Sequence, residues 1–247
     1  MYVYVFDNTF EGFLTCIYES YYNEIKPDSI SIKESYTNNL IDIPLEITTD
    51  IKKSSKVYIS MEKNFTNQTL KNIFNVFLSN NKNKYWILYN YIRLAFKFKS
   101  DVDMYLNNSF ILDASKISKS VQLEAHKFTG FVRFKEFETN KFYASIEPDN
   151  NILVLLSKHF VSRFSNQYFI IHDIKRNLAL IYNCNDYFIT ELDGDYYKKI
   201  STLNDSIYEN LWKNYFSSAS IDSRKNPRLQ CRQMPKKYWK HILETQK

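Results

Sequence analysis

Hydrophobic periodicity changes near residue 130, and this change constrains the fold of the chain more than any other feature. Between Thr66 and Phe128, apolar residues recur every three or four positions, which is the spacing of one helix face. From Gly130 onward they alternate with polar residues over short runs, as in strands with one buried face. The sequence therefore predicts an α+β fold, with a helical middle and a C-terminal half that holds a small antiparallel sheet packed by helices.

The first 64 residues predict a βα unit followed by short strands. Tyr2–Phe6 is rich in β-forming residues and stops at residues 7–9, Asp-Asn-Thr, which suit the cap of a helix that begins at Phe10. Gly12 lies inside this helix, where glycine costs about 1 kcal/mol relative to alanine, so we interpret it as a close packing contact. Further along, alternating runs predict strands at 30–33, 45–48 and 57–60.

Helices and strands of the remaining chain follow from the same periodicities. Apolar stripes predict helices at 70–78, 86–96, 115–128 and 150–164, and around 207–216. Alternation predicts strands at 131–137, 142–146, 168–172 and 178–182, with a weaker hairpin and a loop over 185–204. The switch of period suggests two domains, residues 1–128 and 129–247, or one continuous domain.

Positive charge is concentrated at the C-terminus. From Arg224 to Lys247 the chain holds eight Lys and Arg residues and one acid, Glu244, which leaves 25 basic and 26 acidic residues elsewhere. This asymmetry favours a polyanionic partner, nucleic acid first and a membrane surface second, while a solvated charged tail is the alternative. Pro227 and Pro235, with apolar residues among the charges, indicate a folded edge instead of a loose tail.

Several classes of protein are disfavoured by composition. Three widely spaced cysteines fit a reducing cytosol, and they predict neither a disulfide scaffold nor an iron–sulfur cluster built by this chain alone. Four scattered histidines and three glycines lack the spacing of zinc sites, P-loops or dinucleotide-binding fingerprints. The chain starts without a signal peptide and has no apolar run of about 18 residues. We expect a cytoplasmic protein without metal, cofactor or membrane span.

Residues 127–134 resemble the RNP1 strand of the RNA-recognition fold at five of its eight positions, although here a second strand, not a helix, is predicted to follow. On a strand, Phe131, Arg133, Lys135 and Phe137 share one face. Such a face can stack on bases and contact phosphates, as in single-strand binders. An amphipathic strand whose charges face water is the equal alternative.

Two clusters carry groups suited to catalysis. His172 and Asp173 end a predicted strand and precede Lys175 and Arg176, a combination suited to acid–base or phosphoryl chemistry. Adjacent strand residues point to opposite faces, so a polar turn is the favoured interpretation. Asp7 is the third candidate: with Glu11 and Glu19 it suits a metal ion, but helix capping and first-turn electrostatics account for Asp7 and Glu11 equally well.

Five blocks in order along the chain resemble a family of uncharacterised bacterial proteins assigned to DNA metabolism. They are YVFDNTFEGFLTCIYESY, EAHKFTGFVRFKEF, YASIEPDNNILVLLSKHFVSRF, IIHDIKRNLALIYN and RKNPRLQCRQMPKKYW. Members of this family are typically encoded beside a radical SAM enzyme proposed to repair or modify DNA, and a related domain occurs fused to uracil-DNA glycosylase-like domains. The resemblance implies a role in DNA repair or modification beside such a partner, and it supplies no catalytic residues.

The first hypothesis is a nucleic-acid-binding accessory protein that presents DNA, single-stranded or damaged, to a radical SAM partner enzyme. Phosphate contacts are expected from Arg133, Lys135, Lys175, Arg176, Arg224, Lys225, Arg228, Arg232, Lys236 and Lys237. Phe131, Phe137 or Trp239 would stack on bases. A second hypothesis is a glycosylase-like or nuclease-like enzyme that uses His172, Asp173 or Asp7. A third is an adaptor whose basic residues bind an acidic protein.

Overall fold

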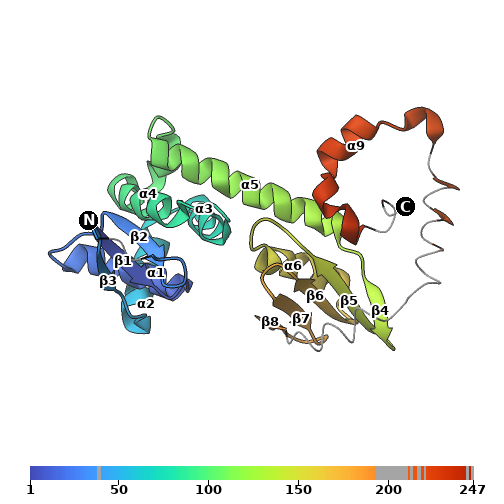
Figure 1. Cartoon of the computed structure of the whole chain (residues 1–247), viewed down its shortest axis with the longest axis horizontal. Helices are drawn as coiled ribbons and strands as arrows, with labels where there is room; N and C mark the ends of the chain where they lie inside the picture. The colour runs from blue at the N-terminus through green and yellow to red at the C-terminus, as the bar shows by residue number, and fades with distance from the viewer. Residues whose placement is uncertain are drawn as a thin grey trace. The chain divides into compact units, whose positions relative to one another are not determined.

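The structure is a computed structural model that describes residues 1–37, 40–192 and 221–242, together with 211, 214, 215, 218, 219 and 245. Its contacts divide the chain into two units, Met1–Val121 and Gln122–Lys247. The boundary lies inside the long helix α5 (Ser109–Phe131), whereas the sequence suggested a boundary after residue 128. Both units combine helices and strands (Figure 1), so the predicted α+β class is confirmed.

The first unit contains a three-stranded parallel sheet in the order β2-β1-β3. The central strand, β1 (Tyr2–Phe6), pairs with β2 (Ser29–Ile32) on one side and with β3 (Ile43–Glu46) on the other. Helix α1 (Phe10–Tyr22) follows β1 directly, and the side chain of Thr9 caps it. This arrangement confirms the N-terminal βα unit and two of the three short strands that the sequence predicts.

The third of those strands, at 57–60, is wrong, because these residues belong to helix α2 (Ile51–Asn64). Asp50 caps this helix by accepting hydrogen bonds from two backbone amides of its first turn, at 2.8 and 3.1 Å. Val57 and Met61 lie four residues apart and are both buried, so the inward face has helical spacing. The alternation around residue 57 was too short to distinguish the two periods.

Three further helical elements complete the first unit before α5. They are α3 (Asn67–Leu78), α4 (Lys84–Phe98) and the short 3₁₀ helix η1 (Lys99–Met104), and the first two confirm the predicted helices. Their apolar faces pack with α1 and the start of α5 in one core, which includes the buried side chains of Phe13, Ile73, Leu88, Tyr89, Ile92 and Ile111.

A polar network, here called the Asp103 network, is buried among these helices. The carboxylate of Asp103 accepts hydrogen bonds from Thr69 Oγ1 at 2.9 Å, from Asn72 Nδ2 at 3.1 Å and from the hydroxyl of Tyr91. Asn72 in turn accepts a hydrogen bond from Ser118 Oγ at 2.7 Å. Thr69 and Tyr91 are 0% exposed and Asn72 is 5% exposed, so their donors depend on the carboxylate and not on water.

The second unit holds a five-stranded sheet in the order β4-β5-β6-β7-β8. Three of its four pairings are antiparallel, as predicted, but β5 and β6 run parallel because helix α6 (Leu153–Arg163) lies between them in the chain. Phe160 of α6 and Phe164, which follows the helix, pack against Phe134 and Phe169. In chain order the strands are Lys135–Glu138, Lys141–Ile146, Tyr168–Asp173, Leu178–Tyr182 and Tyr187–Glu191.

The strand predicted from residue 131 is wrong in its first half. Helix α5 continues to Phe131, and β4 begins only at Lys135. The guanidinium of Arg133 donates hydrogen bonds to two backbone carbonyls at the end of the helix, at 2.6 and 3.2 Å, which helps to satisfy groups that a helix end leaves unpaired. The basic and aromatic face expected from Phe131 to Phe137 therefore does not form, since only its last two members lie on a strand.

Two predicted elements lie partly outside the described residues. β8 is the described part of the hairpin predicted over 185–204, and residues 193–204 are outside the description. In the helix predicted around 207–216, Leu211 and Tyr215 are described as helical and exposed, while Ile207 and Phe216 are outside the description. Among the helices of the described ranges, none has the length and apolar character required to cross a bilayer.

Gly12 lies in a tight polar cradle at the start of α1. A Cβ atom at this position would lie 2.3 Å from Asp7 Oδ1, 2.7 Å from Thr49 Oγ1 and 2.9 Å from Thr9 Oγ1. These atoms are already hydrogen-bonded, since Thr9 and Thr49 donate to the carboxylate of Asp7 at 2.6 and 2.7 Å. The interpretation of Gly12 as a close packing contact is confirmed.

Substitution Gly12→Ala is expected to lower the free energy of unfolding by about 1–3 kcal/mol, because the new methyl group must open this cradle. Gly130→Ala is the matched control: Gly130 also lies in a helix, but a Cβ there meets nothing within 4 Å. The control should be neutral or more stable by up to about 1 kcal/mol. Urea unfolding of both variants checks this, and equal midpoints would contradict the steric argument.

Candidate nucleic-acid interface

The basic segment, defined as residues 224–242, is folded. It begins at the last residue of a 3₁₀ turn, η2 (Asp222–Arg224), and contains helix α9 (Pro227–Gln233) and the 3₁₀ helix η3 (Lys236–His241). Asn226 caps α9 by accepting a hydrogen bond from the amide of Leu229 at 3.0 Å, and the proline takes the first helical position, where its missing N–H costs nothing. The folded edge expected from the prolines and apolar residues is therefore present.

A buried carboxylate on α5 holds the segment against the rest of the second unit. Glu124, which is 8% exposed, accepts hydrogen bonds from the Tyr238 hydroxyl at 2.6 Å, from the amides of Asp149 and Asn150 at 2.8 and 2.9 Å, and from Asn150 Nδ2 at 2.6 Å. The ring of Tyr238 packs edge-on against Phe128, with centroids 4.9 Å apart. Helix η3 is thus fixed to both α5 and the loop that follows β5.

Two cations of the segment are neutralised by that same loop. Lys237 pairs with Asp149, and Lys240 pairs with Glu147. His241 lies 3.4 Å from Glu147 through Nε2 and 3.1 Å from Ser145 Oγ through Nδ1. Partial burial acts to raise the pKa of Glu147, but Lys240 and His241 outweigh it, so the net shift of this pKa is downward. Lys237, a predicted phosphate contact, is therefore engaged within the protein.

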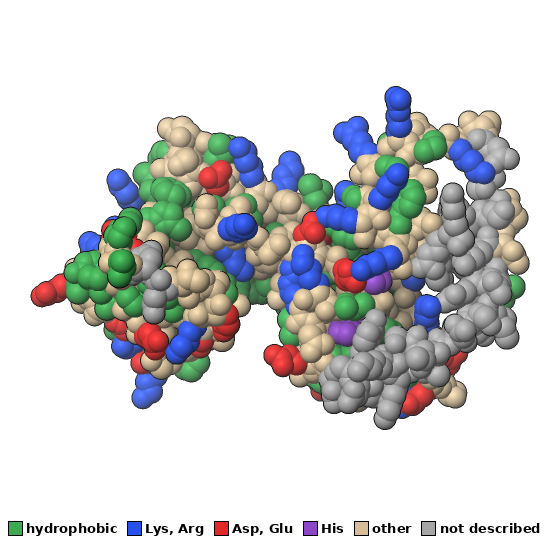
Figure 2. Space-filling view, viewed as in Figure 1, with side chains coloured by type: hydrophobic (Ala, Val, Ile, Leu, Met, Phe, Trp, Pro, Cys, Tyr) green, Lys and Arg blue, Asp and Glu red, His purple; other side chains and the backbone are tan. Residues whose placement is uncertain are grey.

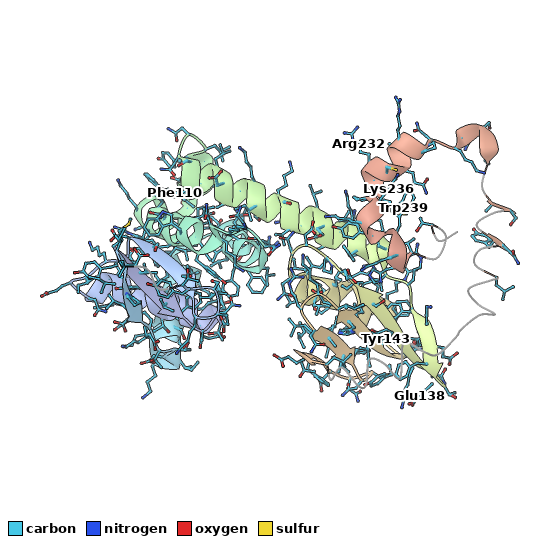
Figure 3. The ribbon with its side chains drawn as sticks, viewed as in Figure 1. Phe110, Glu138, Tyr143, Arg232, Lys236 and Trp239 are labelled. Carbon is cyan, nitrogen blue, oxygen red and sulfur yellow. The ribbon has the colours of Figure 1, made fainter. Side chains whose placement is uncertain are left out.

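The other cations of the segment face solvent. Arg224, Arg228, Arg232 and Lys236 are exposed, and among the residues that the structure describes no carboxylate pairs with any of them. Lys225 is exposed as well. Lys and Arg side chains project from this segment in Figure 2, and Arg232, Lys236 and Trp239 follow one another along it in Figure 3. We call Arg224, Arg228, Arg232 and Lys236 the cation set.

Trp239 lies three residues after Lys236, the last member of the cation set. Its indole N–H donates to the carbonyl of Met234 at 2.9 Å, which fixes the half-buried ring. Lys236 Nζ lies 5.9 Å from the ring centroid, in cation–π range. The other rings predicted to stack are packed internally: Phe131 contacts Phe128 and Tyr238, and Phe137 packs on the core of the sheet.

The turn between β6 and β7 lies next to the same loop. Arg176 donates to Asp173 Oδ2 at 2.7 Å, to the carbonyl of Pro148 at 3.2 Å and to the carbonyl of Asp149. This guanidinium therefore fastens the loop, and we assign it a structural role in place of a phosphate contact. Lys175 is exposed on the turn. Lys135, at the start of β4, is half-buried and opposite Tyr143 in the ladder.

His172 and Asp173, the proposed catalytic pair, have separate partners. His172 Nδ1 lies 2.8 Å from the hydroxyl of Tyr143, whereas Asp173 pairs with Arg176. Burial lowers the pKa of His172 and raises the pKa of Asp173, the latter partly offset by the guanidinium. Their exposed fractions are 2% and 0%, so a nucleic-acid strand cannot reach them in this conformation.

The acids of the first βα junction are not gathered in one site. Among the described residues no group of three His, Cys, Asp or Glu side chains is placed to hold a metal ion. Glu19 pairs with Lys53 at 2.6 Å. Burial acts to raise the pKa of Asp7, but hydrogen bonds from Thr9 and Thr49 outweigh it and lower this pKa. Asp7 therefore supports the start of α1.

Glu124 is the important residue that sequence reasoning missed. Its signal was its position: it lies three residues after Val121 and four before Phe128, on the apolar face of the predicted helix. An acid at such a position requires buried donors, which here come from residues 149, 150 and 238.

The chain belongs to a family defined by a domain of unknown function, DUF4130, whose family model matches residues 82–244. The match begins just before α4 and includes the second unit's sheet and the basic segment. No significant match was found among curated proteins or among solved structures.

Proposed function

We propose that this chain is a nucleic-acid-binding accessory protein in DNA repair or modification, and that it acts in the cytoplasm with a radical SAM partner enzyme. The observation that carries the binding proposal is the cation set, four exposed charges without acidic partners among the described residues. The DNA-metabolism role and the partner enzyme rest on the resemblance of the five sequence blocks.

A polyanion fits the cation set for physical reasons. Four like charges on one short segment repel one another, and phosphate groups relieve that repulsion. Three of the four are arginines, whose planar guanidinium matches phosphate geometry better than an ammonium does. Docking of η3 by Tyr238 orders the segment before it binds, which lowers the conformational entropy lost on association. Lys175 extends the positive surface on the turn that contacts the same loop.

The enzyme hypothesis has less support, since His172 and Asp173 are buried in internal contacts. An adaptor that binds an acidic protein uses the same cations, so it is an outcome that the binding experiment must distinguish.

Binding of fluorescein-labelled single-stranded and duplex DNA, followed by anisotropy, tests the proposal. The double variant Arg228→Ala/Arg232→Ala is expected to bind on the order of tenfold or more weakly at 0.15 M salt, because two phosphate contacts are lost. Lys71→Ala/Lys158→Ala, which removes two exposed charges outside the segment, should bind like the wild type. Equal affinities of the two double variants would refute a specific role for the segment.

Absence of DNA binding, with capture of the purified radical SAM protein, would favour the adaptor.

A further inference from the structure

The first unit contains a cavity that no function described so far uses. It lies among α1, α2 and α4 and has a volume of about 500 Å³, within the range of small-ligand sites. Half of its lining side chains are aromatic: Tyr18, Tyr21, Tyr22 and Phe96. Lys56 and Ser60 of α2 add a cation and a hydroxyl, and no carboxylate lines the cavity. Helices α1 and α2 lie side by side in Figure 1.

Two of the four aromatic residues that line this cavity are exposed, and the other two are half-buried. Tyr21 is 52% exposed and Tyr22 is 73% exposed. Tyr18 and Tyr22 stack with centroids 4.3 Å apart, and Tyr21 packs edge-on against Phe96 at 6.0 Å. These contacts order the rings while their remaining surface meets solvent. Ordered, exposed rings around a concave surface are typical of sites that stack on a planar ligand.

The charges around the cavity favour an anionic ligand. Lys56 Nζ lies 5.8 Å from the centroid of Tyr18, is exposed, and has no acidic partner among the described residues. Lys53 lies at the same distance from this ring but pairs with Glu19, so the charge of Lys53 is already neutralised. A planar group with a phosphate nearby matches this combination of rings and a cation.

We propose that the cavity binds one unpaired nucleotide of a DNA strand, with the base among the tyrosine rings and a phosphate near Lys56. This inference rests on the proposed function, because it takes the ligand to be nucleic acid. Most of the lining residues precede residue 82, so the site lies largely outside the part of the chain that the family model matches.

The test compares two oligonucleotides of equal charge on the full chain: a thymidylate 12-mer and a fully abasic 12-mer, both labelled with fluorescein. The wild type is expected to prefer the thymidylate about tenfold, since stacking on aromatic side chains requires a base. The variant Tyr22→Ala/Lys56→Gln should lose at least about fivefold of this preference. The two oligonucleotides carry the same charge, so the general loss of a cation weakens the binding of both equally. The ratio of their affinities therefore reports on the base alone.

The matched control is Tyr58→Ala/Lys63→Gln, which makes the same two changes at exposed positions of α2 that do not line the cavity. It should keep the preference for thymidylate, and Tyr22→Phe should keep it too, because the ring remains. Thermal melting verifies that each variant is folded. An unchanged preference in a folded Tyr22→Ala/Lys56→Gln variant would overturn the inference.

The remaining outcomes separate this inference from the proposed function. If both 12-mers bind equally with a steep salt dependence, the inference fails while the proposed function stands. If the wild type binds neither 12-mer, the inference fails, and the proposed function fails with it when duplex DNA is not bound either. Free thymidine monophosphate should not compete at equal nucleotide concentration, and equal competition would replace the DNA strand by a free nucleotide as the occupant and so overturn the inference.

Discussion

Replacing Glu124 by alanine is expected to lower the free energy of unfolding of the second unit by about 3–5 kcal/mol and to release the basic segment. The carboxylate accepts four hydrogen bonds in a buried position, and its loss leaves the donors of Asp149, Asn150 and Tyr238 without a partner. Denaturant unfolding measures the stability. Limited trypsin digestion at the arginines and lysines of the segment measures its release.

Two variants separate the causes of this effect. Tyr238→Phe keeps the ring against Phe128 and loses only the hydroxyl, so we expect a smaller cost of about 1–2 kcal/mol. Glu138→Ala removes an exposed glutamate of β4 (labelled in Figure 3) that pairs with Lys141 at 2.6 Å, and it should change stability by less than about 1 kcal/mol. If Glu124→Ala unfolds and digests like Glu138→Ala, the docking role of Glu124 is wrong.

Asp103→Ala is expected to destabilise the first unit by about 3 kcal/mol, because it removes the acceptor of the Asp103 network. Thr69, Asn72 and Tyr91 are too buried to recover these hydrogen bonds from water without local opening. Burial together with the Asp103 hydrogen bond raises the pKa of Tyr91, so its hydroxyl remains a donor at neutral pH.

Asp101→Ala is the matched control for this change. Asp101 lies in the same 3₁₀ helix but is exposed, and its hydrogen bond with Ser100 is at the surface. Its removal should stay within about 0.5 kcal/mol of the wild type. Thermal and urea unfolding compare the two variants, and a cost at Asp103 no greater than at Asp101 would show that the network does not stabilise the unit.

The parts of the fold that the sequence predicted are those set by local periodicity. Helices α3 and α4 follow from long apolar stripes, and the βα unit follows from a strand, a capping cluster and a stripe in direct succession. Strand predictions that rested on only a few residues were wrong. Four residues around Val57 alternate in polarity inside α2, and the RNP1-like residues begin on the last turn of α5. In both places the periodicity of a longer helix overrode a short strand-like pattern.

The sequence predicts the positive charge of the candidate interface, but not which of its cations pair with acids inside the protein. The excess of Lys and Arg after residue 223 is visible in the sequence. Which of these cations stay available depends on contacts between distant residues: Tyr238 and Glu124 are 114 positions apart, and Lys237 and Asp149 are 88 apart. Such pairings leave no periodic trace in a single sequence. The burial of His172 and Asp173 likewise depends on how β5, β6 and the following turn meet.

The salt dependence of duplex DNA binding tests the central claim most directly. If the cation set makes the phosphate contacts, the slope of log affinity against log salt should be about −3.6 for four contacts, against about −5.4 if all six cations from Arg224 to Lys237 took part. In Arg228→Ala/Arg232→Ala the slope should fall to about −1.8, while Lys71→Ala/Lys158→Ala should keep the wild-type value. A wild-type slope near zero, or one unchanged in the arginine variant, would contradict the account.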